Sequence, residues 1–100
     1  MPRFDVHRSR WSSVDLLVVV QADVFDGLDT RLAIPLLPER ANRRAIARLN
    51  PTFVIHEKRY VLYTQHMLAV SLEGLKQPIA NLAEHRDEIV SAVDFLQQGF

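Results

Sequence analysis

Cysteine is absent from this sequence of 100 residues, and glycine is scarce, with only three. Without cysteine there is no disulfide framework and no thiolate nucleophile, and that absence fits a reducing cytoplasm. Gly27, Gly74 and Gly99 stand too far apart to form a glycine-rich loop that cradles phosphate. Neither a Gly-x-Ser-x-Gly elbow nor a His-Glu-x-x-His pair occurs, so the sequence predicts no metal site, no cofactor and no serine-hydrolase chemistry.

Net charge and long apolar runs are also missing. The 12 basic and 12 acidic side chains cancel, so direct sequence-specific binding to nucleic acid is not expected of the protein alone. The longest apolar run, residues 16–20, is far too short to cross a bilayer. The first residues lack the apolar centre of a signal peptide, and we therefore expect a cytoplasmic protein with no membrane partner.

What is present is typical of one globular domain. The apolar fraction is 48%, and the length suits a single domain over residues 1–100. A chain of this size buries only about two-thirds of its unfolded surface, so it gains stability from association. A two-fold homodimer is the commonest closed arrangement, and we predict one here.

Strand patterns fill most of the first three-quarters of the chain. Residues 3–7 alternate apolar with polar, and residues 16–20 are apolar on both faces, which predicts a central strand covered on both sides. Residues 31–38 form a further strand in which Pro35 predicts an edge or a bulge. Residues 53–63 predict a hairpin with a polar tip, and residues 67–72 one more strand. The total is about five strands.

Helical patterns occupy two segments. An amphipathic helix is predicted to begin near Asn81, with Glu84 completing a capping box, and to end at Gly99. Residues 39–49 predict a shorter helix with an arginine stripe that includes Arg43 and Arg44, either as a solvated face or as a site for an acidic partner. Because the strands precede the main helix, the fold class is α+β with a mostly antiparallel, partly barrel-like sheet.

Residue types alone point to few chemical sites. Asp23, Asp26, Asp29 and Arg31 share one loop and could support acid–base cleavage of RNA, but their spacing does not argue for it. The four histidines are scattered. Trp11 lies in a polar loop, where it is either pinned to the core or held out for a partner. These observations favour a protein that binds partners rather than an enzyme.

Two motifs and the tail carry a resemblance. Val-Gln-Ala-Asp at residues 20–23 precedes Ile-Pro-Leu at residues 34–36, and the last quarter adds Asn-Leu-Ala-Glu-His-Arg-Asp-Glu-Ile at residues 81–89 with a terminal Gly-Phe. With this length and order of elements, the chain resembles the CcdB family of toxins from type II toxin–antitoxin systems, a class that also serves plasmid maintenance.

The resemblance implies a homodimer with an SH3-like barrel of about five strands, a C-terminal helix and no catalysis. It implies a topoisomerase poison that binds the DNA gyrase A subunit at Phe95, Gln98, Gly99 and Phe100 and traps the cleaved-DNA complex. Gln98 stands where the well-known toxins of the family have tryptophan, and Phe100 replaces their isoleucine.

The resemblance also implies an antitoxin. A CcdA-like antitoxin would neutralise the toxin with a disordered acidic and apolar tail that folds on binding. The contacts expected for it are Arg8, Arg10, Trp11, Arg43 and Arg44. Two alternatives remain open, an endoribonuclease toxin of the same barrel that uses the loop from Asp23 to Arg31, and a non-toxic family member that only binds its antitoxin.

Overall fold

The computed structural model describes residues 2–10, 15–40 and 45–99. Seven strands, four short 3-10 turns and one α-helix make up this part of the chain. In chain order they are β1 (Asp5–Ser9), β2 (Leu16–Val19), η1 (Asp23–Phe25), β3 (Thr30–Pro38), β4 (Thr52–Ile55), β5 (Lys58–Leu62), η2 (Thr64–His66), β6 (Leu68–Ser71), η3 (Leu72–Gly74), β7 (Leu75–Asn81), η4 (Ala83–His85) and α1 (Arg86–Gln98).

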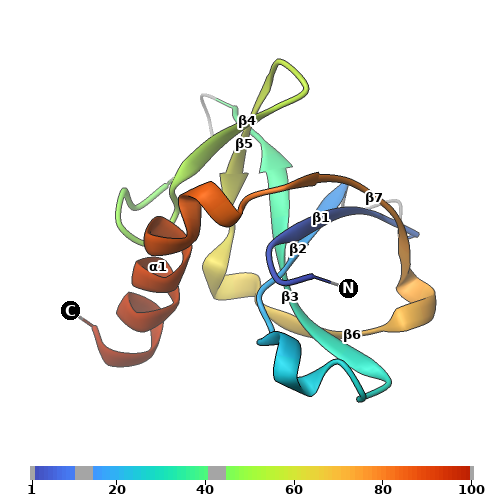
Figure 1. Ribbon diagram of the computed structural model, residues 1–100. Coiled ribbons are helices and arrows are strands. Elements are labelled where there is room, and N and C mark those ends of the chain that lie inside the picture. Colours follow the sequence, from blue (N-terminus) through green and yellow to red (C-terminus); the bar gives the residue numbers. More distant parts are fainter. Residues whose placement is uncertain (1, 11–14, 41–44, 100) are drawn as a thin grey trace.

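The strands form one curled antiparallel sheet. Its main path runs β4-β5-β3-β2-β1-β7, and β6 pairs with β3 off that path. Figure 1 shows α1 on one side of the sheet, while β6 and β7 curve around the other. The described strands therefore make a half-barrel with a C-terminal helix, and no pairing among them joins β4 to β7. A closed SH3-like barrel stays a prediction.

The centre of the sheet is β2, as its apolar run predicts. All four of its residues are buried, and β1 and β3 pair with it on either side. Leu16 and Val18 face a cluster that includes Ile89 and Ala92 of α1, whereas Leu17 and Val19 face a second cluster with Val70 and Leu75. One cover is thus the C-terminal helix and the other is the curled sheet itself, which explains why β2 is apolar on both faces.

The prediction of about five strands is too low. The predicted segments, with two strands in the hairpin, correspond to β1 to β6, and β7 was missed. Residues 75–81 contain Lys, two Gln or Asn side chains and Pro78, and most of them are exposed. They pair with β1 through an irregular register with two shifts. An exposed edge strand with a proline lacks the apolar alternation on which strand prediction depends.

Pro35 lies within an internal strand, so the prediction of an edge position is wrong. β3 pairs with β2 along one side, while its other side pairs with β6 at residues 30–33 and with β5 at residues 36–38. Pro35 stands where the partner changes from β6 to β5. A residue without an N–H is tolerated there because the ladder is interrupted at that point.

The helix begins later than predicted. Asn81 ends β7, and its Oδ1 accepts a hydrogen bond from the Ala83 N–H at 2.8 Å. A 3-10 turn follows, and α1 starts only at Arg86. The asparagine does cap backbone donors, but of a 3-10 turn rather than of the α-helix. The predicted helix over residues 39–49 is also wrong for the described part, because residues 45 and 46 have no regular structure and residues 47–49 form a turn. Arg43 and Arg44 lie outside the described residues.

Candidate functional site

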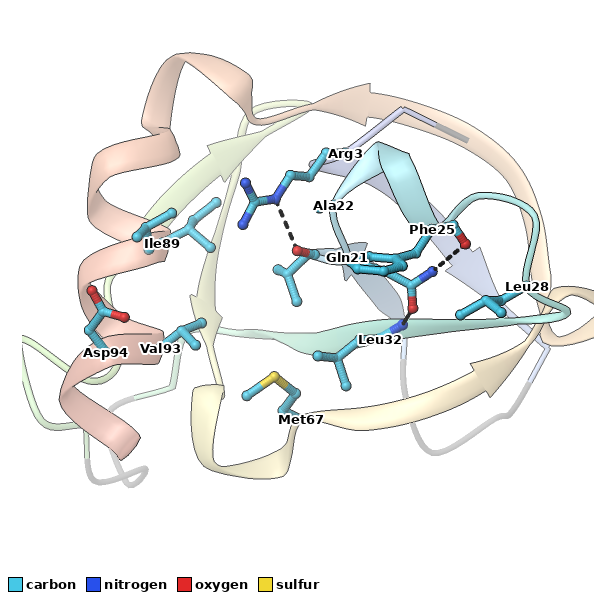
Figure 2. Close-up of a pocket in the computed structure, with 12 residues that line it drawn as sticks. Arg3, Gln21, Ala22, Phe25, Leu28, Leu32, Met67, Ile89, Val93 and Asp94 are labelled. Carbon is cyan, nitrogen blue, oxygen red and sulfur yellow. Dashed lines mark hydrogen bonds between the residues drawn. The ribbon is translucent and has the colours of Figure 1, made fainter. Parts of the chain in front are cut away.

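An apolar groove of about 450 Å³ runs between α1 and the segment from η1 to β3. We call it the apolar groove. Its helix wall is formed by Ile89, Val90, Val93 and Asp94, and its opposite wall by Gln21, Ala22, Phe25, Leu28 and Leu32, with Arg3, Val20 and Met67 between them. Figure 2 shows these side chains converging from the two walls.

Large apolar side chains remain exposed at this groove. Phe25 and Leu28 are each 53% exposed and Leu32 is 39% exposed, and neighbouring Val24 reaches 81%. Contiguous apolar surface of this kind on a small protein marks a contact site for another macromolecule. Val24 and Phe25 were not among the site residues predicted from the sequence, although two bulky apolar residues between Asp23 and Asp26 were a usable signal.

Hydrogen bonds from two polar side chains that line the groove connect the backbone segments around it. Gln21 donates through Nε2 to the Phe25 carbonyl at 3.2 Å and accepts from the Leu32 N–H at 3.2 Å. Arg3 donates through Nε to the Val20 carbonyl at 3.0 Å. All three bonds appear in Figure 2. They tie η1 to β3 and the chain start to β2, so they fix the backbone that carries the apolar wall.

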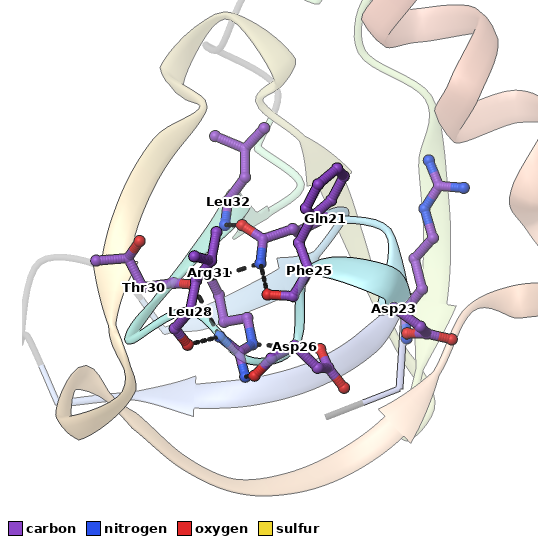
Figure 3. Close-up of polar contacts among 9 residues, drawn as sticks. Gln21, Asp23, Phe25, Asp26, Leu28, Thr30, Arg31 and Leu32 are labelled. Atoms are coloured by element: carbon purple, nitrogen blue, oxygen red, sulfur yellow. Dashed lines mark hydrogen bonds and ion pairs between the residues drawn. The ribbon is translucent and has the colours of Figure 1, made fainter.

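Arg31 fastens the loop behind this wall. Its side chain is only 4% exposed, and its guanidinium donates to the backbone carbonyls of Leu28, Thr30 and Asp26. The Asp26 carboxylate lies 3.5 Å from Arg31 Nε. Figure 3 shows the guanidinium enclosed by the loop that it bonds. A buried cation with this set of acceptors stabilises the loop.

These contacts count against the loop as a catalytic centre for RNA. The Asp23 carboxylate accepts a hydrogen bond from the Arg3 backbone N–H at 2.7 Å, and Asp26 pairs with Arg31. Arg31 is buried and engaged with carbonyls, so it is not placed to meet a phosphate. The structure therefore assigns the loop from Asp23 to Arg31 a structural role in shaping the apolar groove.

The end of α1 differs from the groove in being mostly polar. Gly99 ends the helix in a left-handed conformation with φ 78°, and its N–H donates to the Phe95 carbonyl at 2.8 Å. A Cβ on Gly99 would meet no atom within 4 Å, so the requirement for glycine comes from φ and not from space. Gln98 is exposed, while the Phe95 ring is half-buried under the Arg48 guanidinium at 4.8 Å. Phe100 lies outside the described residues.

The expected antitoxin contacts are only partly visible. Arg8 and Arg10 are both exposed, but they line two different hollows. Arg10 lies near His7 and Lys76, whereas Arg8 lies near His56 and Lys58. Trp11, Arg43 and Arg44 fall outside the described residues. The proposed antitoxin site stays a prediction.

Over the described ranges, no group of three or more His, Asp or Glu side chains is placed to hold a metal ion. Within the same ranges, the structure contains no helix with the length and apolar character needed to span a membrane.

Comparison with known proteins gives a family and a fold. The model of the CcdB protein family matches residues 3–99. Among solved structures, an endoribonuclease in complex with its cognate antitoxin from Mycobacterial species aligns with TM-score 0.76 at 14% identity, covering 100% of this chain and 98% of that chain. The Mycobacterium tuberculosis toxin MazF-mt6 aligns with TM-score 0.72 at 13% identity over 90% of this chain and 92% of that chain. An endoribonuclease from Mycobacterial species gives TM-score 0.72 at 14% identity, covering 97% and 90%.

These likenesses overturn one expectation from the sequence. Residue types and the resemblance both predicted that the chain is not an enzyme. Two of the three structures that share its fold nearly end to end are of endoribonucleases. The outright exclusion of enzymatic activity is therefore wrong. The prediction failed because one fold can host many different functions, so motifs that indicate the fold do not decide whether the protein is an enzyme.

Proposed function

Because the chain belongs to the CcdB family, we propose that it is the toxin of a type II toxin–antitoxin pair. The family match over residues 3–99 carries this proposal. A structure with the same fold was solved in complex with its cognate antitoxin, which supports an antitoxin as partner here. The proposed antitoxin is CcdA-like, with a disordered segment that folds on the toxin.

The proposed target is the DNA gyrase A subunit, reached through the end of α1. One observation supports this target. Gln98 and Gly99 are exposed at a helix end whose backbone is set by a left-handed glycine, so both residues are accessible to a partner.

The proposed assembly is a homodimer joined through the apolar groove. Phe25 and Leu28 expose about half of their surface there, and association removes apolar surface from water at about 25 cal/mol per Å². A two-fold dimer uses the same patch on both subunits. Since α1 forms one wall of that patch, the two helix ends would lie near the dimer interface and form one bivalent binding face.

Cleavage of RNA is the second candidate, favoured by the fold shared with endoribonucleases. The buried position of Arg31 directs this candidate away from the loop that the sequence suggested.

One experiment separates the two candidates. The chain is expressed from an inducible promoter in a bacterium, and the cells are assayed for growth arrest and for gyrase trapped on cleaved DNA. Purified protein is incubated in parallel with RNA. Trapped gyrase, lost when residues 99–100 are deleted, supports the gyrase target. RNA cleavage that survives this deletion supports the second candidate. Unimpaired growth, with neither trapped gyrase nor RNA cleavage, contradicts the proposal that the protein is a toxin.

A further inference from the structure

A small polar cavity lies beneath the β4–β5 hairpin, away from the apolar groove. We call it the hairpin cavity. Its volume is about 160 Å³, and it is lined by Arg8, Leu16, Ile55, His56, Lys58, Tyr60 and Ile79. These residues come from β1, β2, the hairpin and β7, so four parts of the chain enclose it. Figure 1 shows the hairpin projecting above the ends of these strands.

The two charged residues that line the hairpin cavity are both cations. Arg8 and Lys58 are exposed at its wall, and none of its lining residues is acidic. Glu57, which stands between His56 and Lys58 in the chain, does not line the cavity. In a protein whose total charge is zero, a lining with two cations and no carboxylate is a local departure from that balance.

The turn above the hairpin cavity has positive φ at both of its central residues. His56 and Glu57 have φ 49° and φ 68°, and neither is glycine. A two-residue hairpin turn of type I′ requires positive φ at both positions, so the hairpin itself accounts for this backbone. The His56 ring is fixed, because Nε2 bonds to the Ile79 carbonyl at 3.1 Å. A carbonyl can only accept, so Nε2 carries the hydrogen in this bond.

The floor of the hairpin cavity is apolar. Leu16 and Ile55 are buried, and Tyr60 is half-buried beside them. Charges over an apolar floor interact more strongly with a ligand than charges in open water. Tyr60 adds a hydroxyl that can donate a hydrogen bond. Residues that carry hydrogen-bond donors thus line one small volume from β1 and from β5.

From this arrangement we propose that the hairpin cavity binds a phosphate group. A lining that carries a guanidinium, an ammonium and a phenol on two strands suits an anion with several oxygens in different directions better than a planar carboxylate. The phosphate could be a free phosphate or part of a nucleic-acid backbone. The proposal does not rest on the toxin function, because its test measures binding and neither toxicity nor gyrase trapping.

The test titrates the full-length protein with three probes at low salt. They are inorganic phosphate, adenosine monophosphate and a short single-stranded 2′-O-methyl oligoribonucleotide, which binds but resists cleavage. We expect saturable binding of at least one probe. Arg8→Gln and Lys58→Gln should each weaken binding about fivefold, and for the oligonucleotide each should reduce the salt slope by about 0.7. Binding of the small probes alone identifies a free phosphate, and binding of the oligonucleotide identifies a backbone phosphate.

Matched controls come from the same hairpin. Arg59→Gln removes an equal charge from β5 at a residue that does not line the hairpin cavity, and it should change affinity less than about twofold. His56→Asn keeps a residue that tolerates positive φ but removes the ring, so it should weaken binding, whereas Glu57→Asn should not. Arg8 and Lys58 are exposed, so their variants should keep the parent melting temperature.

Three results would overturn the proposal. The first is the absence of saturable binding for all three probes. The second is equal loss of affinity in the Arg59 and Lys58 variants, which would indicate only diffuse attraction to charge. The third is binding of an acidic peptide that depends on Arg8 and Lys58 while all phosphate probes fail, which would assign the hairpin cavity to a carboxylate-bearing partner.

Discussion

The apolar groove and the hairpin cavity are hollows of opposite chemistry on one small sheet. The groove is about 450 Å³ and is walled by aliphatic and aromatic side chains that remain partly exposed. The hairpin cavity is about 160 Å³ and presents cations over an apolar floor. The groove suits a protein surface, because apolar burial is non-directional and grows with area. The cavity suits one anionic group, because charged hydrogen bonds are directional.

The two regions also differ in how their backbones are held. The loop behind the groove depends on a buried side chain, Arg31, that satisfies three backbone carbonyls. The turn over the cavity instead adopts positive φ at His56 and Glu57 and closes the β4–β5 ladder between Ile55 and Lys58. Removing the Arg31 side chain should therefore destabilise the first loop. Removing a Cβ at His56 or Glu57 should relieve the unfavourable backbone conformation of the second.

The largest effect is expected for Arg31→Ala. This change leaves three carbonyls and the Asp26 carboxylate without their cation, and we expect a loss of about 3 kcal/mol in the free energy of unfolding. For a domain of this size the melting temperature should fall by roughly 12–24 °C. Arg59→Ala is the control, since its pair with Glu39 is exposed on both sides and is worth about 0–1 kcal/mol. Equal losses in the two variants would contradict the buried role of Arg31.

The second-largest effect is expected for Phe25→Ala, which should weaken the proposed dimer. Phe25 is 53% exposed in the single chain and lines the groove, so its truncation should weaken self-association about thirtyfold, or about 2 kcal/mol, with little change in folding. Sedimentation over a range of concentrations measures this effect. Val54→Ala is the matched control, an exposed apolar residue on β4 that does not line the groove. Identical association constants for parent and Phe25→Ala would remove the groove from the interface.

A smaller gain is expected from Gln98→Trp. An aromatic ring at the exposed helix end supplies the kind of side chain that dominates protein interfaces, and we expect gyrase trapping to rise about tenfold, or about 1.4 kcal/mol. Gln97→Trp places the same ring on the neighbouring exposed position and should change trapping little. If both variants trap gyrase no better than the parent, the tail is not the contact site.

The smallest effect is a stabilisation. Glu57 has φ 68°, and Glu57→Gly removes the Cβ that makes this conformation unfavourable. Part of this gain is offset by the greater freedom of glycine in the unfolded chain, so the net increase should be about 0.5 kcal/mol. A denaturant titration with an unchanged slope would measure it. A lower midpoint for the variant would show that the turn is not strained.

Local pattern predicted the parts of the fold that are regular and buried. The apolar run at residues 16–20 predicted the central strand, and the hairpin at residues 53–63 and the strand at residues 67–72 followed from alternation and turn residues. β7 escaped prediction because an exposed edge strand does not need an apolar face. The start of α1 was not predicted correctly, because the Asn81 side chain bonds the Ala83 N–H at the start of a 3-10 turn instead of capping the α-helix.

The candidate site was harder to predict than the fold. The sequence placed Asp23, Asp26 and Arg31 in one loop, but the role of Arg31 depends on the backbone carbonyls that surround it, which no side-chain pattern reveals. In the sequence, Val24 and Phe25 lie within the predicted loop from Asp23 to Arg31. Only the tertiary structure places Phe25 across the groove from Val93 of α1. Family membership followed from motifs, whereas the likeness to endoribonucleases came from the arrangement of the strands.

The sequence by itself determined the class of fold, the central strand, the single main helix and the family, because these depend on side-chain periodicity and on local motifs. The tertiary structure decided which exposed apolar residues meet across a groove, that Arg31 is buried, and that Arg8 and Lys58 face one cavity. The physical reason is that such contacts join segments far apart in the chain. They are set by the curl of the sheet and by the point at which each strand changes partner.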